Sequence, residues 1–277
     1  MGHDGELTFA LISDIHFGPE ARFGGKLRKL TAQGPALVQA FVDRMNREVR
    51  PDFLVNLGDD IEDEDLEADR ARYRACIDAL RGAEADLVNV AGNHDVIHLT
   101  PADLLEIWGR GGEGAALYSS FDRGDYHFVV LHTRERKDLD VSVGIEQLAW
   151  LEKDLNASKG KPVIGLMHHS VADQDLRGNR WFEGAPNICL VRERRAIRAL
   201  FEAHGGVLAV FNGHLHWNHL DVIRGVPYVT LQSLIENVDD DAPGRAAAAH
   251  AVVRLSKRRV LVEVEGAERA RYQFDRR

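Results

Sequence analysis

Histidine, aspartate and asparagine residues gather in five short motifs that are spread along the chain. The motifs are Asp14-x-His16, Gly58-Asp59, Gly92-Asn93-His94-Asp95, His168-His169 and Gly213-His214-Leu215-His216. Carboxylate, imidazole and amide-oxygen donors without thiolates suit divalent metals such as Mn²⁺, Fe²⁺/Fe³⁺, Zn²⁺ or Co²⁺. There are enough donors for two ions. Two metals bridged by a carboxylate lie about 3.5–4 Å apart, generate hydroxide from a shared water and neutralise phosphoryl oxygens.

Each motif directly follows a short apolar run that indicates a β-strand. In open α/β sheets, ligands bind at the edge where the carboxyl ends of the strands meet. We therefore expect groups that are far apart in the sequence to share one cleft. Gly58, Gly92 and Gly213 allow the backbone to turn sharply after a strand and to bring the neighbouring ligand close to an ion.

The first part of the chain alternates between strand and helix patterns. Near-continuous apolar runs at 7–13, 53–57 and 87–90 are typical of strands that are covered on both faces. A charged helical stretch occupies 65–81. Another helix ends before Pro51 and has its apolar stripe at Val38, Phe41, Val42, Met45 and Val49. This order predicts a parallel sheet with right-handed crossovers.

The rest of the chain adds further strands, helices and two hairpins. Strands are predicted at 126–131, 163–167 and 207–211, and helices at 148–155 and 192–203. Antiparallel hairpins are predicted at 220–231 and 252–264, whereas 170–186 and 236–249 are interpreted as loops or caps. We therefore expect an α/β fold with mixed sheets packed face to face and helices outside. Because no linker or repeat divides the chain, residues 1–277 are expected to form a single domain.

The five motifs, in this order, resemble the calcineurin-like metallophosphoesterase family, whose pattern is D-x-H, G-D, G-N-H-[DE], H and G-H-x-H. The resemblance implies one metal held by Asp14, His16 and His216, a second held by Asn93, His168 and His214, and Asp59 as the bridge. In the family, the histidine of the third motif contacts the substrate phosphate and protonates the leaving oxygen. The resemblance therefore implies that His94 is the general acid and that Asp95 orients it.

The resemblance also implies a fold and an activity. The family fold is a two-sheet β-sandwich flanked by helices, in agreement with the mixed pattern above. Segments 118–121 and 146–151 resemble spacer regions of bacterial phosphodiesterase-like members. The implied function is a binuclear metal-dependent phosphoester hydrolase with a metal-bridging hydroxide as nucleophile. We expect a phosphodiesterase acting on a small phosphoester substrate, namely a small phosphodiester or a nucleotide. Where many relatives have a proline soon after the His-His pair, this chain has Ser170-Val171-Ala172.

Other functions are compatible with the same motifs. A phosphomonoesterase or a nucleotide pyrophosphatase of this family would carry nearly identical ones. A nuclease is disfavoured by the acidic balance and by the lack of a long basic stripe. A noncatalytic scaffold with this fold should have lost metal ligands or the acid, whereas this chain has kept all of them.

Composition limits the class of protein. The 277 residues include 35 Lys and Arg against 44 Asp and Glu, a net charge of −9, which argues against nucleic acid as a partner. Cys76 and Cys189 form no C-x-x-C motif, which favours a reducing compartment. With no secretory signal pattern and no apolar run of about 18 residues, we expect a cytoplasmic protein without a membrane partner. No pattern indicates an oligomeric state.

Several neighbours of the motifs have a less specific interpretation. His169 could support a ligand or the substrate, or simply pack. The acidic run after Asp59 is typical of a solvated helix start, although Glu62 could support a ligand. Core packing is favoured over stacking on a substrate for Trp181, Phe182 and Trp217. For the arginines of 192–198, a solvated helix is favoured over phosphate binding.

Overall fold

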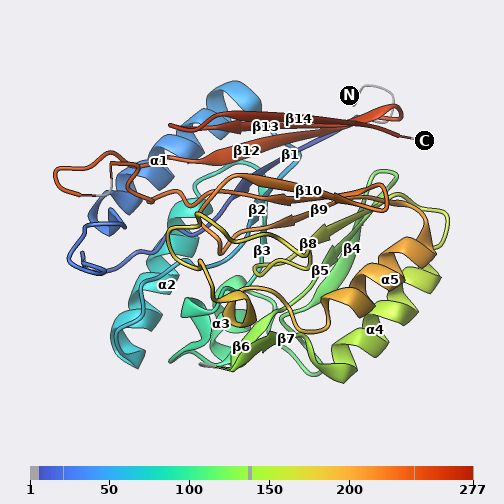
Figure 1. Ribbon diagram of the computed structural model, residues 1–277, viewed down its shortest axis with the longest axis horizontal. Coiled ribbons are helices and arrows are strands. Elements are labelled where there is room, and N and C mark those ends of the chain that lie inside the picture. The colour runs from blue at the N-terminus through green and yellow to red at the C-terminus, as the bar shows by residue number, and fades with distance from the viewer. Residues whose placement is uncertain (1–5, 21, 137–138, 240, 277) are drawn as a thin grey trace.

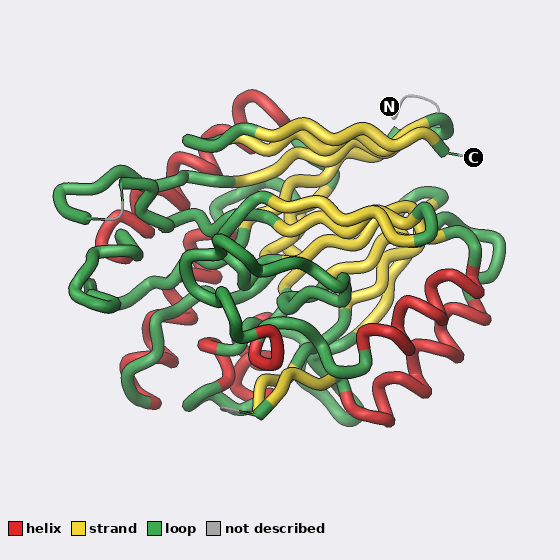
Figure 2. The backbone as a smooth tube through the Cα atoms, in the orientation of Figure 1, coloured by secondary structure: helices red, strands yellow, loops and turns green. Residues whose placement is uncertain are grey.

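Two large β-sheets face each other in the computed structural model, which describes residues 6–20, 22–136, 139–239 and 241–276. Figure 1 shows α1 and α2 on one side of the strands and α4 and α5 on the other, and Figure 2 shows the strands as two layers. The strand order is β14-β13-β12-β1-β2-β3 in the first sheet and β10-β11-β9-β8-β5-β4 in the second. The predicted fold class, α/β with two mixed sheets flanked by helices, is confirmed.

The elements have the following bounds. The first sheet contains β1 (Leu7–Ile12), β2 (Phe53–Asn56), β3 (Asp86–Asn89), β12 (His250–Leu255), β13 (Arg259–Glu265) and β14 (Ala270–Asp275). The second contains β4 (Ser119–Arg123), β5 (Tyr126–Val130), β8 (Val163–Leu166), β9 (Val207–Asn212), β10 (His219–Ile223) and β11 (Val226–Thr230). A small ribbon consists of β6 (Arg134–Arg136) and β7 (Asp140–Ser142). The helices are α1 (Gly34–Arg44), α2 (Leu66–Leu80), α3 (Pro101–Trp108), α4 (Gly144–Ala157) and α5 (Arg194–His204).

Parallel strands form the centre of both sheets. β2 pairs in parallel with β1 and with β3, and β5, β8, β9 and β11 are successive parallel neighbours. Parallel neighbours require a crossover connection. Helices supply it between β1 and β2, β2 and β3, β5 and β8, and β8 and β9, whereas β10 lies in the connection between β9 and β11. The hairpins β10–β11 and β12–β13 are antiparallel, as predicted. The carboxyl ends of the central strands therefore meet at one edge of each sheet.

The near-continuous apolar runs arise because the central strands are covered on both faces. In β1, Phe9 and Leu11 pack between the sheets, whereas Ala10 and Ile12 pack against the helices α1 and α2. Strands of this kind cannot alternate between apolar and polar residues, because neither face contacts water. The second sheet is built in the same way, with α4 and α5 covering its outer face.

Phenylalanine rings fill the space between the two sheets. Phe128 is completely buried, and its ring centre lies 5.6 Å from that of Phe9, 5.1 Å from that of Phe53 and 5.0 Å from that of Phe121. The rings of Phe9 and Phe211 meet edge to face at 5.9 Å. Offset-stacked and edge-to-face pairs add stability beyond the burial of apolar area, so this cluster fixes the distance between the sheets.

Helix α5 is less solvated than its sequence predicts. The side chain of Arg198 is buried and donates to the carbonyl oxygen of Val171, and both Arg194 and Arg198 pair with Asp173. Burying a guanidinium is tolerated here because a carboxylate and a carbonyl accept its hydrogen bonds. The arginines therefore anchor the segment after His169 to the helix instead of lying on a solvated face.

The sequence patterns missed helix α3 and the strands β4, β6, β7 and β14. Helix α3 has only eight residues, and its start is marked by a capping box in which Thr100 and Asp103 bond each other's backbone. Strand β4 follows directly after a loop and pairs with β5. Strand β14 lies at a sheet edge, and its residues alternate between half-buried and exposed. Elements this short, or half-buried at a sheet edge, do not give a clear periodic signal.

The structure bears on the predictions about the two cysteines and about membrane-spanning helices. Cys76 and Cys189 are both buried free thiols, consistent with the absence of a disulfide motif. None of the described helices combines the length and the apolar character needed to cross a bilayer.

The phenylalanine cluster predicts a large loss of stability on truncation. Phe128→Ala should lower the free energy of unfolding by about 3–5 kcal/mol, because it removes a buried ring and leaves a cavity between the sheets. Chemical denaturation of the two proteins measures the difference. The control is Ile145→Ala at a side chain that is 80% exposed, which should change stability by no more than about 0.5 kcal/mol. A Phe128→Ala cost as small as that of the control would contradict this account of the core.

Candidate metal centre

The five motifs meet where the two sheets lie next to each other. The loops after β1 and β2 are joined by a hydrogen bond from the backbone N–H of Asp14 to the carbonyl oxygen of Gly58, 2.9 Å long. The loops after β8 and β9 are joined by one from Gly213 N–H to the carbonyl oxygen of His168, 3.0 Å long. The backbone N–H of His214 donates to the Asp14 carboxylate, which connects the two sheets.

Asp14, His16 and His216 form the first of the two predicted ligand groups. Nε2 of His216 lies 3.3 Å from Oδ1 of Asp14 and 3.3 Å from Nε2 of His16. All three residues are buried, and one donor atom from each lies within 4.8 Å of the other two. The lone pairs of these atoms are close enough to share one cation.

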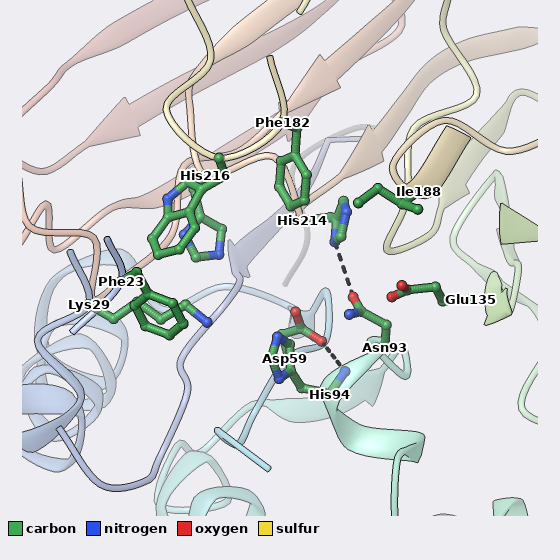
Figure 3. Close-up of a pocket in the computed structure, with 11 residues that line it drawn as sticks. Phe23, Lys29, Asp59, Asn93, His94, Glu135, Phe182, Ile188, His214 and His216 are labelled. Carbon is green, nitrogen blue, oxygen red and sulfur yellow. Dashed lines mark hydrogen bonds between the residues drawn. The ribbon is translucent and has the colours of Figure 1, made fainter. Parts of the chain in front are cut away.

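Asn93, His168 and His214 form the second group. Oδ1 of Asn93 lies 3.2 Å from Nε2 of His168 and 3.1 Å from Nδ1 of His214, the contact drawn in Figure 3. His169 also comes close, because its ring nitrogen lies within 4.8 Å of ring nitrogens of His168 and His214. Nδ1 of His169, however, is 2.8 Å from the hydroxyl of Thr133, so His169 lies behind the group rather than facing the pocket.

Asp59 lies between the two groups. Its Oδ1 accepts a 3.0 Å hydrogen bond from the backbone N–H of His94, which leaves Oδ2 toward the ligands. Oδ2 is 3.2 Å from Nε2 of His168 in the second group and 3.8 Å from Nε2 of His16 in the first. This position fits the bridging role that the resemblance implies.

Most of the predicted ligands have a strained backbone. Positive φ angles occur at five of them: Asp14 (53°), His16 (48°), Asp59 (57°), His214 (66°) and His216 (51°). For residues other than glycine this conformation costs on the order of 1–3 kcal/mol and clusters at functional sites, and Asp and His are among the residues that tolerate it best.

Two of the motif glycines are required because the loops approach one another closely. A Cβ atom on Gly92 would lie 2.1 Å from Oδ1 of Asp59, and one on Gly213 would lie 1.9 Å from the hydroxyl of Ser13. Gly58 has a φ of +96°, and its Cβ would also clash with the backbone of Gly92. The sequence interpretation of these glycines, close approach of a ligand after a sharp turn, agrees with this geometry.

The buried carboxylates remain negative because imidazoles compensate them. Burial raises the pKa of Asp59, but the positive charges of His168 and His94 outweigh burial and hold the pKa well below its usual range. Burial likewise raises the pKa of Asp14, and the charge and hydrogen bond of His216 outweigh it. Opposite charges within hydrogen-bonding distance favour the ionised form.

The imidazoles divide into charged and neutral rings. Burial lowers the pKa of His168 and His216, but Asp59 raises the former to about 10 and Asp14 the latter to about 9. Burial and then the charge of Lys29 lower the pKa of His16 to about 4. Burial, followed by the neighbouring rings of His169 and His168, holds the pKa of His214 well below its usual value.

This donor set fits divalent cations. Two buried carboxylates require nearby positive charge, and in the protein alone the protons on His168 and His216 supply it. Two cations would provide the same compensation with neutral imidazoles as ligands, which is the form in which imidazole binds metal. The donors that would hold the two cations are Asp14, His16 and His216, then Asn93, His168 and His214, with Asp59 between them.

The expected pairing of Asp95 with His94 is wrong. Nδ1 of His94 contacts the carboxylate of Asp63 instead. The Asp95 side chain is buried beneath the loops, where it accepts hydrogen bonds from the backbone N–H groups of Asp59, Asp60 and Gly92 at 2.8–2.9 Å. Asp95 therefore shapes the turn that carries the bridging residue, whereas Asp63 orients the ring of His94.

Two glutamates beside the first ligand group were not given a firm role by the sequence analysis. Oε2 of Glu62 lies 3.1 Å from Nδ1 of His16, and Oε2 of Glu236 lies 2.9 Å from Nδ1 of His216. Glu62 lies three residues after Asp59, which is the signal that marked it as a possible support. Glu236 lies in the segment 236–249, which offers no pattern to distinguish it from other loop acids.

A small pocket of about 260 Å³ opens onto the predicted ligands. Trp181 and Phe182 line this pocket together with Phe23. The preference for core packing was therefore wrong for Trp181, whereas Phe182 both lines the pocket and packs against a buried apolar cluster. Trp217 stacks on His219 and donates to Gln174. The described lining residues are Phe23, Lys29, Asp59, Asn93, His94, Glu135, Trp181, Phe182, Ile188, His214 and His216 (Figure 3).

Solved structures with the same fold were compared with the chain. A dimetal phosphatase from Danio rerio is 21% identical with a TM-score of 0.77, and the match covers 98% of this chain and 99% of that one. GAP50, the anchor in the inner membrane complex of Plasmodium, is 14% identical with a TM-score of 0.61 and coverage of 99% and 90%. A phosphopantetheinyl hydrolase from Mycobacterium tuberculosis is 15% identical with a TM-score of 0.51 and coverage of 83% and 91%.

Sequence comparison identifies the family directly. A search of curated proteins found no match. The family model for calcineurin-like phosphoesterases matches residues 7–218, which contain all five motifs and every predicted ligand. The chain belongs to the calcineurin-like phosphoesterase family.

Proposed function

We propose that the protein is a binuclear metal-dependent phosphodiesterase that acts on small phosphodiesters or nucleotides. The observation that carries this proposal is the position of Asp59 between two groups of buried donors at the base of the pocket. Two divalent cations held by these groups would supply an activated water and neutralise the phosphoryl oxygens of the substrate.

His94 is the group proposed to protonate the leaving oxygen. Because Nδ1 contacts Asp63, Nε2 is the ring nitrogen left for the substrate. Burial lowers the pKa of His94, but the charge of Asp59 and the bond to Asp63 outweigh burial and raise the pKa above its ordinary value. A raised pKa keeps a proton on the ring, as a general acid requires.

The charges around the pocket favour a diester over a monoester. Among the described residues that line it, Lys29 is the one lysine or arginine, and its ammonium lies 2.8 Å from Glu62. Glu135 adds a carboxylate to the lining. A phosphomonoester dianion would require more positive charge than a diester, which carries a single negative charge.

The size and lining of the pocket favour a small substrate with an apolar or planar group. Its volume of about 260 Å³ is close to the lower end of the range typical of small-molecule sites. The rings of Phe23 and Trp181 meet edge to face at 5.0 Å and form one wall. Because aromatic walls bind bases by stacking, a nucleotide pyrophosphatase is the second candidate function.

Metal loading and diester cleavage test the proposal. After removal of metal and reloading with Mn²⁺, the protein should bind about two ions per chain and cleave bis-p-nitrophenyl phosphate. Asp59→Asn should abolish cleavage because it weakens both groups at once, whereas Asp43→Asn on the surface of α1 should not. A protein that takes up no divalent metal would instead support the scaffold alternative.

Turnover of cyclic nucleotides, glycerophosphodiesters, nucleotide pyrophosphates and phosphomonoesters then separates the substrate classes.

Substitutions beside His94 distinguish the acid from its supports. His94→Ala should leave metal binding intact and lower kcat about 10²- to 10⁴-fold on substrates with poor leaving groups, the usual contribution of general acid catalysis. Asp63→Asn should also lower kcat, because the His94 ring loses its carboxylate partner. Asp95→Ala should lower the thermal midpoint instead, because three backbone donors lose their acceptor. Kinetics, metal content and thermal unfolding measure these effects, and loss of metal in His94→Ala would place His94 among the ligands.

The aromatic wall predicts a substrate-dependent change in KM. Phe23→Ala should raise KM for nucleotide substrates by roughly 5- to 150-fold, corresponding to about 1–3 kcal/mol of stacking. For glycerophosphodiesters, which have no ring to stack, KM should change little. Steady-state kinetics on both substrate types provide the comparison. An equal change in KM for both substrate types would show that the Phe23 ring does not stack on the planar group of the nucleotide.

A further inference from the structure

The two imidazoles of the first ligand group share a feature that the second group lacks. Nδ1 of His216 makes a 2.9 Å hydrogen bond with Oε2 of Glu236. Nδ1 of His16 lies 3.1 Å from Oε2 of Glu62, an ion-pair contact without hydrogen-bond geometry. Glu236 is almost completely buried, and the Glu62 side chain is mostly buried. Each ring thus has one nitrogen toward the ligand group and the other against an acid.

The second group is supported by weaker partners. Nδ1 of His168 lies 2.9 Å from the carbonyl oxygen of Leu57. Nε2 of His214 is buried and has no hydrogen-bond partner among the described residues. A carboxylate partner makes an imidazole a more basic ligand and fixes its orientation more strongly than a neutral acceptor does. The two groups therefore differ in the strength with which they can hold a cation.

Both acids are in turn fixed by residues of the pocket wall. Oε2 of Glu62, the oxygen near His16, also accepts from the ammonium of Lys29 at 2.8 Å. Oε2 of Glu236, the oxygen near His216, also accepts from the indole N–H of Trp181 at 3.0 Å. One carboxylate oxygen therefore connects each ligand imidazole to one wall residue.

The wall residues contact one another as well. The ammonium of Lys29 lies 5.4 Å from the ring centre of Trp181 and 5.2 Å from that of Phe23. A cation over aromatic faces is attracted by the ring quadrupole. Lys29, Trp181, Glu62 and Glu236 thus form a continuous set of contacts from the pocket wall to the first ligand group.

We propose that Glu62 and Glu236 are positioning residues that make the Asp14–His16–His216 group the tighter of the two metal sites and couple it to the pocket wall. This inference rests on the metal centre of the proposed function. A wall ring that stacks on substrate is held by the same oxygens that hold the ligand imidazoles. Displacement of Trp181 therefore changes the support of His216, and filling of the first site changes the surroundings of Trp181.

Calorimetric titration of the metal-free full-length protein with Mn²⁺ is the principal test. Wild type should show two classes of site with unequal affinity. Glu236→Gln and Glu62→Gln should each weaken the tighter class about 10- to 100-fold, the usual cost of losing such a partner, and leave the weaker class unchanged. Glutamine keeps the size of the glutamate side chain. Because Glu62 and Glu236 lie on different segments of the chain, the two variants are independent tests of the same proposal.

Tryptophan fluorescence provides a second readout that does not depend on activity. Binding of the first Mn²⁺ equivalent should change the emission of wild type, and Trp181→Phe should abolish most of that change because Trp181 shares its acceptor oxygen with His216. In Glu236→Gln, the same change should require about 10- to 100-fold more Mn²⁺. A change that persists in Trp181→Phe would overturn the proposed coupling.

Glu193→Gln is the matched control. Its carboxylate accepts from Ser142 and from the backbone N–H of Val143, outside the metal centre, so Mn²⁺ affinity should be that of wild type. Thermal unfolding of the metal-free variants identifies any loss of fold. If both Glu62→Gln and Glu236→Gln bind Mn²⁺ like wild type, this inference fails while the proposed function stands. If wild type itself binds no metal, the proposed function fails with it.

Discussion

The burial of two ionised carboxylates at the junction of the sheets is the constraint on which the rest of the structure depends. Asp14 and Asp59 are removed from water, so each requires positive charge and hydrogen-bond donors close by. The surrounding histidines, the backbone N–H groups and the left-handed turns all serve this requirement. Strained turns persist because two well-packed sheets fix the strand ends from which they start.

Much of the fold could be predicted from the sequence because its signals are local. The run from Leu7 to Ile12 is apolar except for Thr8, and such a strand must be covered on both sides. The turn at Arg224-Gly225 marked the hairpin of β10 and β11. The gathering of the donor residues in one cleft could also be predicted, since each motif follows a strand and parallel strands bring their carboxyl ends together. Strand β14 gave a weak signal because none of its residues is fully buried, and helix α3 gave a weak one because it is only eight residues long.

The remaining details of the site depend on how loops approach one another, which no local pattern records. Asp63 and Asp95 are both acids near a motif, and only the fold decides that Asp63 contacts His94 while Asp95 points below the turn. Glu236 reaches His216 because its loop returns alongside Lys29 through an isolated bridge. The aromatic wall arises in the same way, from segments more than 150 residues apart that place Phe23 beside Trp181.

The position of the donors has a mechanical consequence. Asp14, Asp59 and Asn93 follow strands of one sheet, whereas His168, His214 and His216 follow strands of the other. A cation that binds donors of both kinds is a cross-link between the halves of the sandwich, and separating the halves requires its release. By mass action, a cation present at 100 times its dissociation constant adds about 2.7 kcal/mol to the cohesion of the folded chain. Ions held by these donors would thus belong to the architecture as well as to the proposed chemistry.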